Sequence, residues 1–252
     1  MSANTGSMSG RDWAILLFLS VLWGGSFFFI EIAVETVQPF TLVLIRVAIA
    51  SAALWAFLLA RGQRLPLPSG ALLAFVILAL LNNVLPFVLF AWAQKTITGG
   101  LGSILNATTP IWGVLVAHLF TDDERLNPRK LVGVLLGFGG VAVMIGPDLL
   151  ANLGTDALAQ LACIAASLSY ALAAVWARRF RAMGLNPMWV TTGQLSAGAL
   201  MMLPLALLVD QPWTQPLPPV SAWAAITALA IFCTAFGYVL YFRLIDTAGA
   251  TN

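Results

Sequence analysis

Residues 12–33 read DWAILLFLSVLWGGSFFFIEIA, and the only charged side chains in this stretch, Asp12 and Glu31, lie near its two ends. The hydrocarbon core of a bilayer is about 30 Å thick, so roughly 20 apolar residues of helix cross it. The stretch therefore predicts a membrane-spanning helix. Seven similar stretches follow, and we expect spans at residues 12–33, 39–60, 69–95, 100–120, 129–146, 155–177, 187–209 and 219–245.

The composition agrees with this interpretation. Hydrophobic residues make up 60% of the 252-residue chain and charged residues 9%, whereas soluble domains carry about 25% charged residues. We therefore expect an all-α multi-pass membrane protein embedded in a lipid bilayer. Met1–Gly10 is polar but lacks the charged region of a cleaved signal peptide, so we expect a disordered tail. Cys163 and Cys233 both fall within spans, where we expect them to pack as small apolar residues.

The basic residues predict the orientation. With a cytoplasmic N-terminus, ten of the twelve Lys and Arg residues lie at cytoplasmic span ends, as the positive-inside rule requires. These are Arg11, Arg61, Arg64, Arg125, Arg129, Lys130, Arg178, Arg179, Arg181 and Arg243. The remaining two are Lys95, on the outer side, and Arg46, within a span.

The chain repeats itself after roughly 147–150 positions. Ser20–Trp23 aligns with Ser167–Tyr170, Arg46 with Gln194, and Gly99 with Gly249. We expect a cytoplasmic tail (residues 1–11), a first five-helix repeat (12–146), and a second repeat (147–252) that is inverted because each repeat has an odd number of spans. By symmetry a complete second repeat would run to about residue 296, so eight helices of a 5+5 arrangement are expected here and the last two are lacking.

Three motifs carry a resemblance to a known family. Leu22–Phe27 resembles the Trp-Gly-x-x-Phe opening of EamA-type members of the drug/metabolite transporter superfamily. Ala107–Pro110 resembles the family's fourth helix, and Asp123–Leu126 followed by Pro128 resembles its turn before the fifth. Within the family the chain is most similar to YddG-type exporters of aromatic amino acids. The resemblance implies a ten-helix fold with a central cavity, a location in the bacterial inner membrane, and the export of small organic solutes.

Several classes of chemistry lack their motifs. The sequence has no phosphate-binding Gly-x-x-x-x-Gly-Lys-[Ser/Thr] loop, one histidine (His118), and no His-Glu-x-x-His. We expect no enzyme activity, no cofactor, no metal and no nucleic-acid partner. The expected partners are a small-molecule substrate, an amino acid or drug-like solute, and the bilayer, with the protein acting as a monomer.

Arg46 is the candidate charged site residue. A charge inside a span costs energy, so it needs a partner or a function. One interpretation is an ion pair with Glu31 or a side chain that reaches out to the interface. The other is that Arg46 binds a substrate carboxylate or gates the outer mouth.

Span three supplies the polar candidates. Asn82 and Asn83 lie in its middle, shortly before Pro86, and Phe90 follows one turn later. The amides either bond between helices or face a cavity. Pro86 and Pro110 are candidate flexible points.

Aromatic side chains deep in other spans form the rest of the candidate substrate site. They are Trp23 and Phe27 in span one, Tyr170 and Trp176 in span six, and Tyr238 in span eight. Such stripes either pack helices or hold a substrate with a flat apolar part.

These observations favour a secondary transporter that exports small organic solutes, amino acids including aromatic ones, by alternating access through a central cavity. The alternatives are an exporter of drugs or other metabolites, a membrane-embedded enzyme, and a receptor or scaffold with a filled interior. No acidic residue lies deep in a span, so the sequence gives little support for a dedicated proton relay. Facilitated diffusion is therefore weighed equally with proton exchange.

Overall fold

A computed structural model describes residues 9–63, 67–121, 128–145 and 155–248, apart from the side chains of 129, 141, 142, 144, 145, 155 and 245–248. Throughout these ranges the ordered elements are helices, and no strand occurs. This confirms the all-α multi-pass fold. The turn motif at Asp123–Leu126 and most of the polar tail lie outside the described residues.

The helices follow the predicted spans within a few residues. Within the part of the chain described, seven helical segments are long and apolar enough to cross a bilayer. The fifth expected span corresponds to a helix with a shorter apolar stretch, Lys130–Gly140. In order, the elements are α1 (Gly10–Val34), α2 (Pro39–Ala60), α3 (Ala71–Ala79), η1 (Leu80–Val84), α4 (Leu85–Ala93), α5 (Gly99–Asn106), α6 (Thr109–Phe120), α7 (Pro128–Ile145), α9 (Thr155–Ala182), α10 (Pro187–Leu205), η2 (Ala206–Asp210), η3 (Pro212–Thr214), α11 (Val220–Ala228), η4 (Leu229–Phe236) and α12 (Gly237–Ala248).

Helix α1 begins two residues earlier than the expected span. Ser9 and Asp12 form a capping box, in which the Asp12 backbone N–H donates to Ser9 Oγ at 3.2 Å and the Ser9 N–H donates to Asp12 Oδ2 at 3.0 Å. This pairing satisfies two backbone groups that a helix start otherwise leaves open. Gly10 and Arg11 therefore belong to the helix and not to the tail.

Two spans are interrupted by π-helical turns at their middle. The first, η1, lies just before Pro86, which has no backbone N–H and whose ring would clash with the carbonyl of Asn82 in a regular α-helix. The second, η4, contains no proline; instead the Thr234 hydroxyl donates to the Leu229 carbonyl at 2.8 Å, five residues back. The two segments start 149 positions apart, within the spacing of the sequence repeat.

Span four is also broken. Residues Ala107 and Thr108 form a turn between α5 and α6, and Pro110 stands at the second position of α6, where its missing N–H costs nothing. The expected continuous helix over 100–120 is therefore two helices, with the break just ahead of the proline that was expected to flex.

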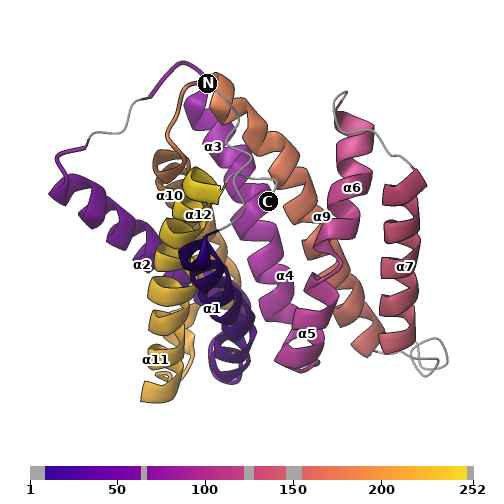
Figure 1. Cartoon of the computed structure of the whole chain (residues 1–252). Coiled ribbons are helices and arrows are strands. Elements are labelled where there is room, and N and C mark those ends of the chain that lie inside the picture. Colours follow the sequence, from indigo (N-terminus) through magenta and orange to yellow (C-terminus); the bar gives the residue numbers. More distant parts are fainter. Residues whose placement is uncertain (1–8, 64–66, 122–127, 146–154, 249–252) are drawn as a thin grey trace.

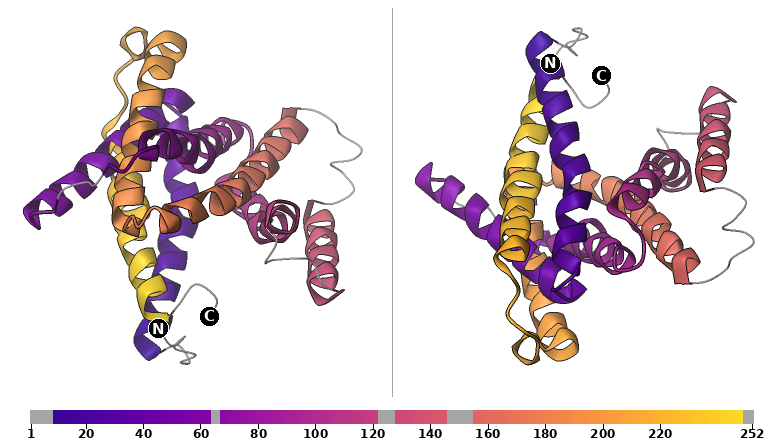
Figure 2. Two further views of the ribbon diagram at one scale, coloured as in Figure 1. Left: turned by 90° about the horizontal axis from the view of Figure 1, so that it is seen from above. Right: turned by 90° about the horizontal axis from the view of Figure 1, so that it is seen from below.

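The helices form two groups joined at the centre (Figure 1). Helices α6 and α7 stand on one side and α2, α11 and α12 on the other, while α4 and α9 lie between them. The views from above and below show α7 at the edge of the molecule, beside α6 (Figure 2). Long apolar side chains such as Leu17, Val21 and Phe28 of α1 are more than 60% exposed, as expected of a surface that faces lipid.

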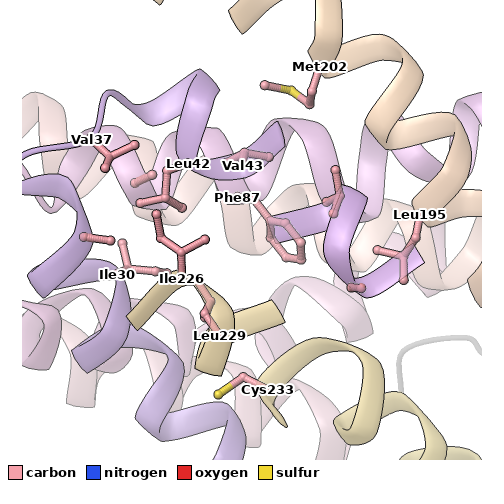
Figure 3. Close-up of a cluster of buried hydrophobic side chains, with 14 of the residues drawn as sticks. Ile30, Val37, Leu42, Val43, Phe87, Leu195, Met202, Ile226, Leu229 and Cys233 are labelled. Atoms are coloured by element: carbon pink, nitrogen blue, oxygen red, sulfur yellow. The ribbon is translucent and has the colours of Figure 1, made fainter. Parts of the chain in front are cut away.

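The largest described core cluster joins both halves of the sequence. Most of its buried members come from α1, α2, α4, α10, α11 and η4, among them Val43, Phe87, Leu195, Leu229 and Cys233. Figure 3 shows these side chains converging, with Phe87 near the middle of the cluster. The same ring forms the base of the candidate functional site.

Candidate functional site

Arg46 lies on the second turn of α2 and is buried, with 6% of its surface exposed. Its guanidinium carbon stands 3.5 Å above the centre of the Phe87 ring in α4. Its Nε–H donates to the Thr234 hydroxyl oxygen in η4 at 3.0 Å. Three helices therefore hold one buried cation, and an aromatic face stabilises it electrostatically.

The expected ion pair between Arg46 and Glu31 is absent from the described structure. Glu31 instead accepts a hydrogen bond from the backbone N–H of Gly99 at 3.1 Å, at the N-terminus of α5. A carboxylate is favoured there because the first N–H groups of a helix are unpaired and carry partial positive charge. Apart from Thr234, Arg46 makes no hydrogen bond or ion pair with the described residues. The snorkelling interpretation is also wrong, since the side chain is buried.

A second polar group lies at η1. The Asn82 amide nitrogen donates to Gln194 Oε1 of α10 at 3.1 Å and to the Tyr238 hydroxyl of α12 at 3.0 Å. The expected bonding between helices is therefore present at Asn82. Asn83 differs, because it is fully buried and neither atom of its amide makes a hydrogen bond of good geometry with the described residues.

The two polar groups are neighbours. Tyr170 and Tyr238 pack against the core cluster that contains Cys233 and Phe87, the ring on which Arg46 lies. Tyr238 therefore links the Asn82 group to the Arg46 group. Arg46, Asn82, Asn83 and Tyr238 were predicted as site residues, and the structure brings them together.

An aromatic chain leads to this polar centre from α1. The Phe27 ring contacts Phe90 at 5.2 Å between centroids with the planes perpendicular, and Phe90 stacks with Tyr170 at 6.3 Å. Edge-to-face and stacked rings are favoured arrangements. Pro86, one residue before Phe87, is buried in the same helix. Of these predicted residues, Tyr170 packs against the core cluster that contains Phe87, and the chain of rings connects Phe90 and Phe27 to it.

The structure places the two predicted tryptophans elsewhere. Trp23 is 37% exposed and lies against the Tyr241 ring, with 5.4 Å between centroids. Trp176 donates its indole N–H to the Ala74 carbonyl at 3.1 Å, and the Arg179 guanidinium covers its ring. The described contacts of Trp176 thus connect α9 to α3 and do not include Arg46.

Gln194 and Thr234 were not predicted as site residues, yet they bond directly to Asn82 and Arg46. The sequence held a signal for both, because Gln194 aligns with Arg46 in the repeat and Thr234 shares a helix face with the predicted residue Tyr238. Arg46 in span two and Gln194 in span seven each bond to the interrupted helix of the other half of the sequence. The sequence separation of 188 residues between Arg46 and Thr234 hides this pairing from any local pattern.

A groove of about 340 Å³ lies apart from this polar centre, between α2, α3 and α10. Its lining is apolar and contains none of the predicted site residues: Trp55, Leu67, Leu72, Phe75, Val76, Gly193, Ser196, Ala197, Leu200 and Met201. Leu72 and Leu200 are largely exposed, so the groove opens on the surface of the helices. Buried charge and amides lie at the Arg46 group instead, which makes that group the stronger candidate for recognising a polar solute.

The described residues contain no set of side chains that could bind a metal ion. No three His, Cys, Asp or Glu side chains lie close enough together to hold an ion. The described polar groups at the site are one guanidinium, amides and hydroxyls, which bind solutes by hydrogen bonds and charge.

Comparison with known proteins agrees with the fold and with a membrane transporter. The chain is 27% identical to "Uncharacterized inner membrane transporter YedA" of Escherichia coli over 236 residues, which cover 91% of this chain and 72% of the relative. It is 26% identical to an "Uncharacterized transporter" of Archaeoglobus fulgidus, with 97% and 83% covered. It is 21% identical to "Uncharacterized transporter YoaV" of Bacillus subtilis, with 94% and 80% covered.

A solved crystal structure shares the fold, with a TM-score of 0.65 and 20% identity over 97% of this chain and 91% of the other. The family model described as the EamA-like transporter family matches residues 12–146 and 157–252. These two matches together cover nearly the whole sequence. The chain therefore belongs to the EamA-like transporter family.

Proposed function

We propose that this membrane transporter exports small organic solutes, chiefly amino acids including aromatic ones. One observation carries the proposal: Arg46 is a buried cation whose terminal nitrogens have no anionic partner among the described residues. Burying an unpaired charge is costly, and a guanidinium matches a carboxylate with two parallel hydrogen bonds. The amides at Asn82 and Asn83 and the aromatic chain through Phe90 suit the remaining polar and flat apolar parts of such a substrate.

Alternating access is the proposed mechanism. Three observations support two inverted halves: the family model matches twice, the π-helical turns recur 149 positions apart, and Arg46 and Gln194 each bond across the halves. Inverted halves related by a pseudo-two-fold axis give two states of similar energy, open to opposite sides. We place the protein in the inner membrane of a bacterial cell with its N-terminus in the cytoplasm, and we take export as the direction of transport because the family resemblance implies it.

Uptake of radiolabelled phenylalanine into liposomes that hold the purified protein tests the substrate. We expect saturable uptake that unlabelled phenylalanine abolishes and that a cationic drug leaves unaffected, with threonine as a weaker competitor. Arg46→Gln removes the charge, and we expect it to lower uptake at least about tenfold because a charged hydrogen bond to the carboxylate is lost.

The matched control is Arg61→Gln. Arg61 also covers an aromatic ring, Phe57 at 4.4 Å, but it is exposed at the end of α2. We expect this variant to transport like the wild type. If Arg46→Gln also does so, or if the folded wild type takes up no amino acid, the amino acid assignment is wrong, and drugs or other metabolites become the class to test.

A further inference from the structure

The bond between Arg46 and Thr234 has a fixed direction. The Thr234 hydroxyl has one hydrogen, which it donates to the Leu229 carbonyl at 2.8 Å inside η4. Its oxygen is therefore left as an acceptor, and it accepts from Arg46 Nε at 3.0 Å. Thr234 is 1% exposed, so water does not compete for the hydroxyl.

This arrangement uses Nε and one face of the guanidinium. The group lies on the Phe87 ring, 3.5 Å from its centre, and its Nε is tied to Thr234. The two terminal nitrogens point their N–H groups along the open end of the planar fork. A carboxylate can accept two parallel bonds from that end, whereas the nitrogen of a primary amide would present hydrogens to it.

The π-helical turn is what brings the hydroxyl to Arg46. In η4 the carbonyl of Leu229 bonds to the Thr234 side chain five residues later, a spacing that a regular α-helix does not provide. π-helical turns of this kind are often found at functional sites. Here the turn leads directly to the residue that holds the buried cation.

We propose that Thr234 is a positioning residue that holds the Arg46 guanidinium so that its two terminal nitrogens bind a substrate carboxylate end-on, which makes the transporter select carboxylates over the matching amides. This proposal rests on the proposed substrate site at Arg46 and specifies how it discriminates. It does not depend on the substrate being an amino acid.

Two ligands of equal shape test it. 3-Phenylpropionate and 3-phenylpropanamide differ only in carboxylate against amide, and titration calorimetry measures both on the purified protein. We expect the wild type to bind the acid at least about tenfold more tightly than the amide, because a hydrogen bond to a charged group is worth more than a neutral one. Thr234→Val keeps the shape and removes the hydroxyl, and we expect it to bind the acid about tenfold more weakly while amide binding changes little.

Thr234→Ser is the rescue variant. Serine supplies the same hydroxyl, so we expect it to retain the preference for the acid. Melting temperatures of all three proteins report whether the changes disturb the fold. Should Thr234→Val fail to fold, Thr234→Ala removes the same hydroxyl, and we expect it to show the same weaker binding of the acid.

A double-mutant cycle separates positioning from a general structural effect. If Thr234 acts through Arg46, Thr234→Val has no further effect on the acid preference in an Arg46→Gln background. Equal binding of acid and amide by the wild type, or an unchanged preference in Thr234→Val, overturns the proposal. An additive loss in the double variant does so as well, because Thr234 then acts independently of Arg46.

The outcomes also distinguish this proposal from the amino acid assignment. A clear acid preference that depends on Thr234, without phenylalanine uptake, overturns the amino acid assignment and supports the carboxylate site. Phenylalanine uptake, together with an acid preference that Thr234→Val leaves unchanged, supports the amino acid assignment and overturns the positioning role of Thr234. If the folded wild type binds neither ligand, the carboxylate site itself is wrong.

Discussion

Gly99, the first residue of α5, sits against α1 with no room for a side chain. A Cβ atom there would lie 2.7 Å from the Phe27 carbonyl oxygen, 2.8 Å from Glu31 Oε2 and 3.0 Å from Gln94 Oε1. The Phe27 oxygen belongs to the backbone of a long helix and cannot move aside as a flexible side-chain end can. Glycine is therefore required for this contact, which also holds the Gly99 N–H on Glu31.

Gly99→Ala should lower the free energy of unfolding by about 1–3 kcal/mol, the usual cost of an overpacked contact. A thiol-reactive dye measures melting through the two buried cysteines, Cys163 and Cys233. The control is Gly100→Ala, whose nearest neighbouring atom would be 3.9 Å away, and which we expect to melt at or above the wild-type temperature. Equal melting of the two variants would show that the α1–α5 contact is not tight.

Single residues show how far the sequence could predict the site. Arg46 and Asn82 are conspicuous because charge and amides are costly in a span, and both lie in the polar centre. Their partners were not predictable from local patterns, because which helix a polar group meets depends on packing. Glu31 illustrates this, since it shares the outer half of the bilayer with Arg46 by sequence but caps α5 instead. Trp176 looked like a site residue and bonds to α3 backbone.

At the scale of helices, α3 and α10 approach each other through Gly193. A Cβ atom there would lie 2.8–2.9 Å from three atoms of the Phe75 ring. That ring stacks on Phe180 of α9, with centroids 5.2 Å apart and planes 12° apart, so it cannot swing away freely. Gly193 thus allows α10 to pack on the α3–α9 pair.

We expect Gly193→Ala to lower the melting temperature and to cost about 1–3 kcal/mol of unfolding free energy, because α10 has to move away from the ring. Gly198→Ala, five residues along the same helix, is the control. Its Cβ would have no neighbour closer than 3.8 Å, so we expect no loss. Thermal melting of the two variants in one detergent measures the difference. A Gly193→Ala protein as stable as its control would mean that the Phe75 ring readily gives way.

Helix positions were predictable, while the interruptions within the helices were only partly so. Apolar length marks each span, and Pro86 signals a fault in span three because a proline removes a helix bond. The longer π-helical segment in span eight has no proline, and the threonine that accompanies it resembles any other threonine in a span. A side-chain bond to a carbonyl five residues back has no counterpart in the 3.6-residue pattern from which helices are predicted.

For the whole molecule, the basic residues predict which side each loop faces, and labelling from outside tests this. Lys95 follows α4, and its Nζ donates to Gln38 Oε1 at 2.9 Å. Gln38 immediately precedes α2, so both residues lie at helix ends on the expected outer side. In a background lacking both native cysteines, Lys95→Cys should react with a membrane-impermeant maleimide added to intact cells. Arg61→Cys, at the other end of α2, should react only after lysis. The reverse pattern would invert the proposed topology.

Alternating access requires helices of opposite halves to separate on one side of the membrane. Helices α2 and α10 are equivalent by the sequence repeat, and they touch where the hydroxyl oxygens of Ser51 and Ser196 lie 2.8 Å apart. Trp55 donates to the same Ser196 oxygen at 3.0 Å, which ties the contact together. Two cysteines at these positions are close enough to form a disulfide, whose sulfurs lie about 2.05 Å apart.

We expect the Ser51→Cys/Ser196→Cys double variant, in a background lacking the native cysteines, to lose phenylalanine uptake on oxidation and to regain it when dithiothreitol reduces the disulfide. Each single variant should transport equally under both conditions, which controls for lost hydrogen bonds at Ser196. The bond blocks transport only if α2 and α10 part during the cycle, because a disulfide tolerates Cα separations of at most about 7 Å. If completely cross-linked protein keeps full uptake, α2 and α10 stay together during transport. The two halves must then separate at another interface.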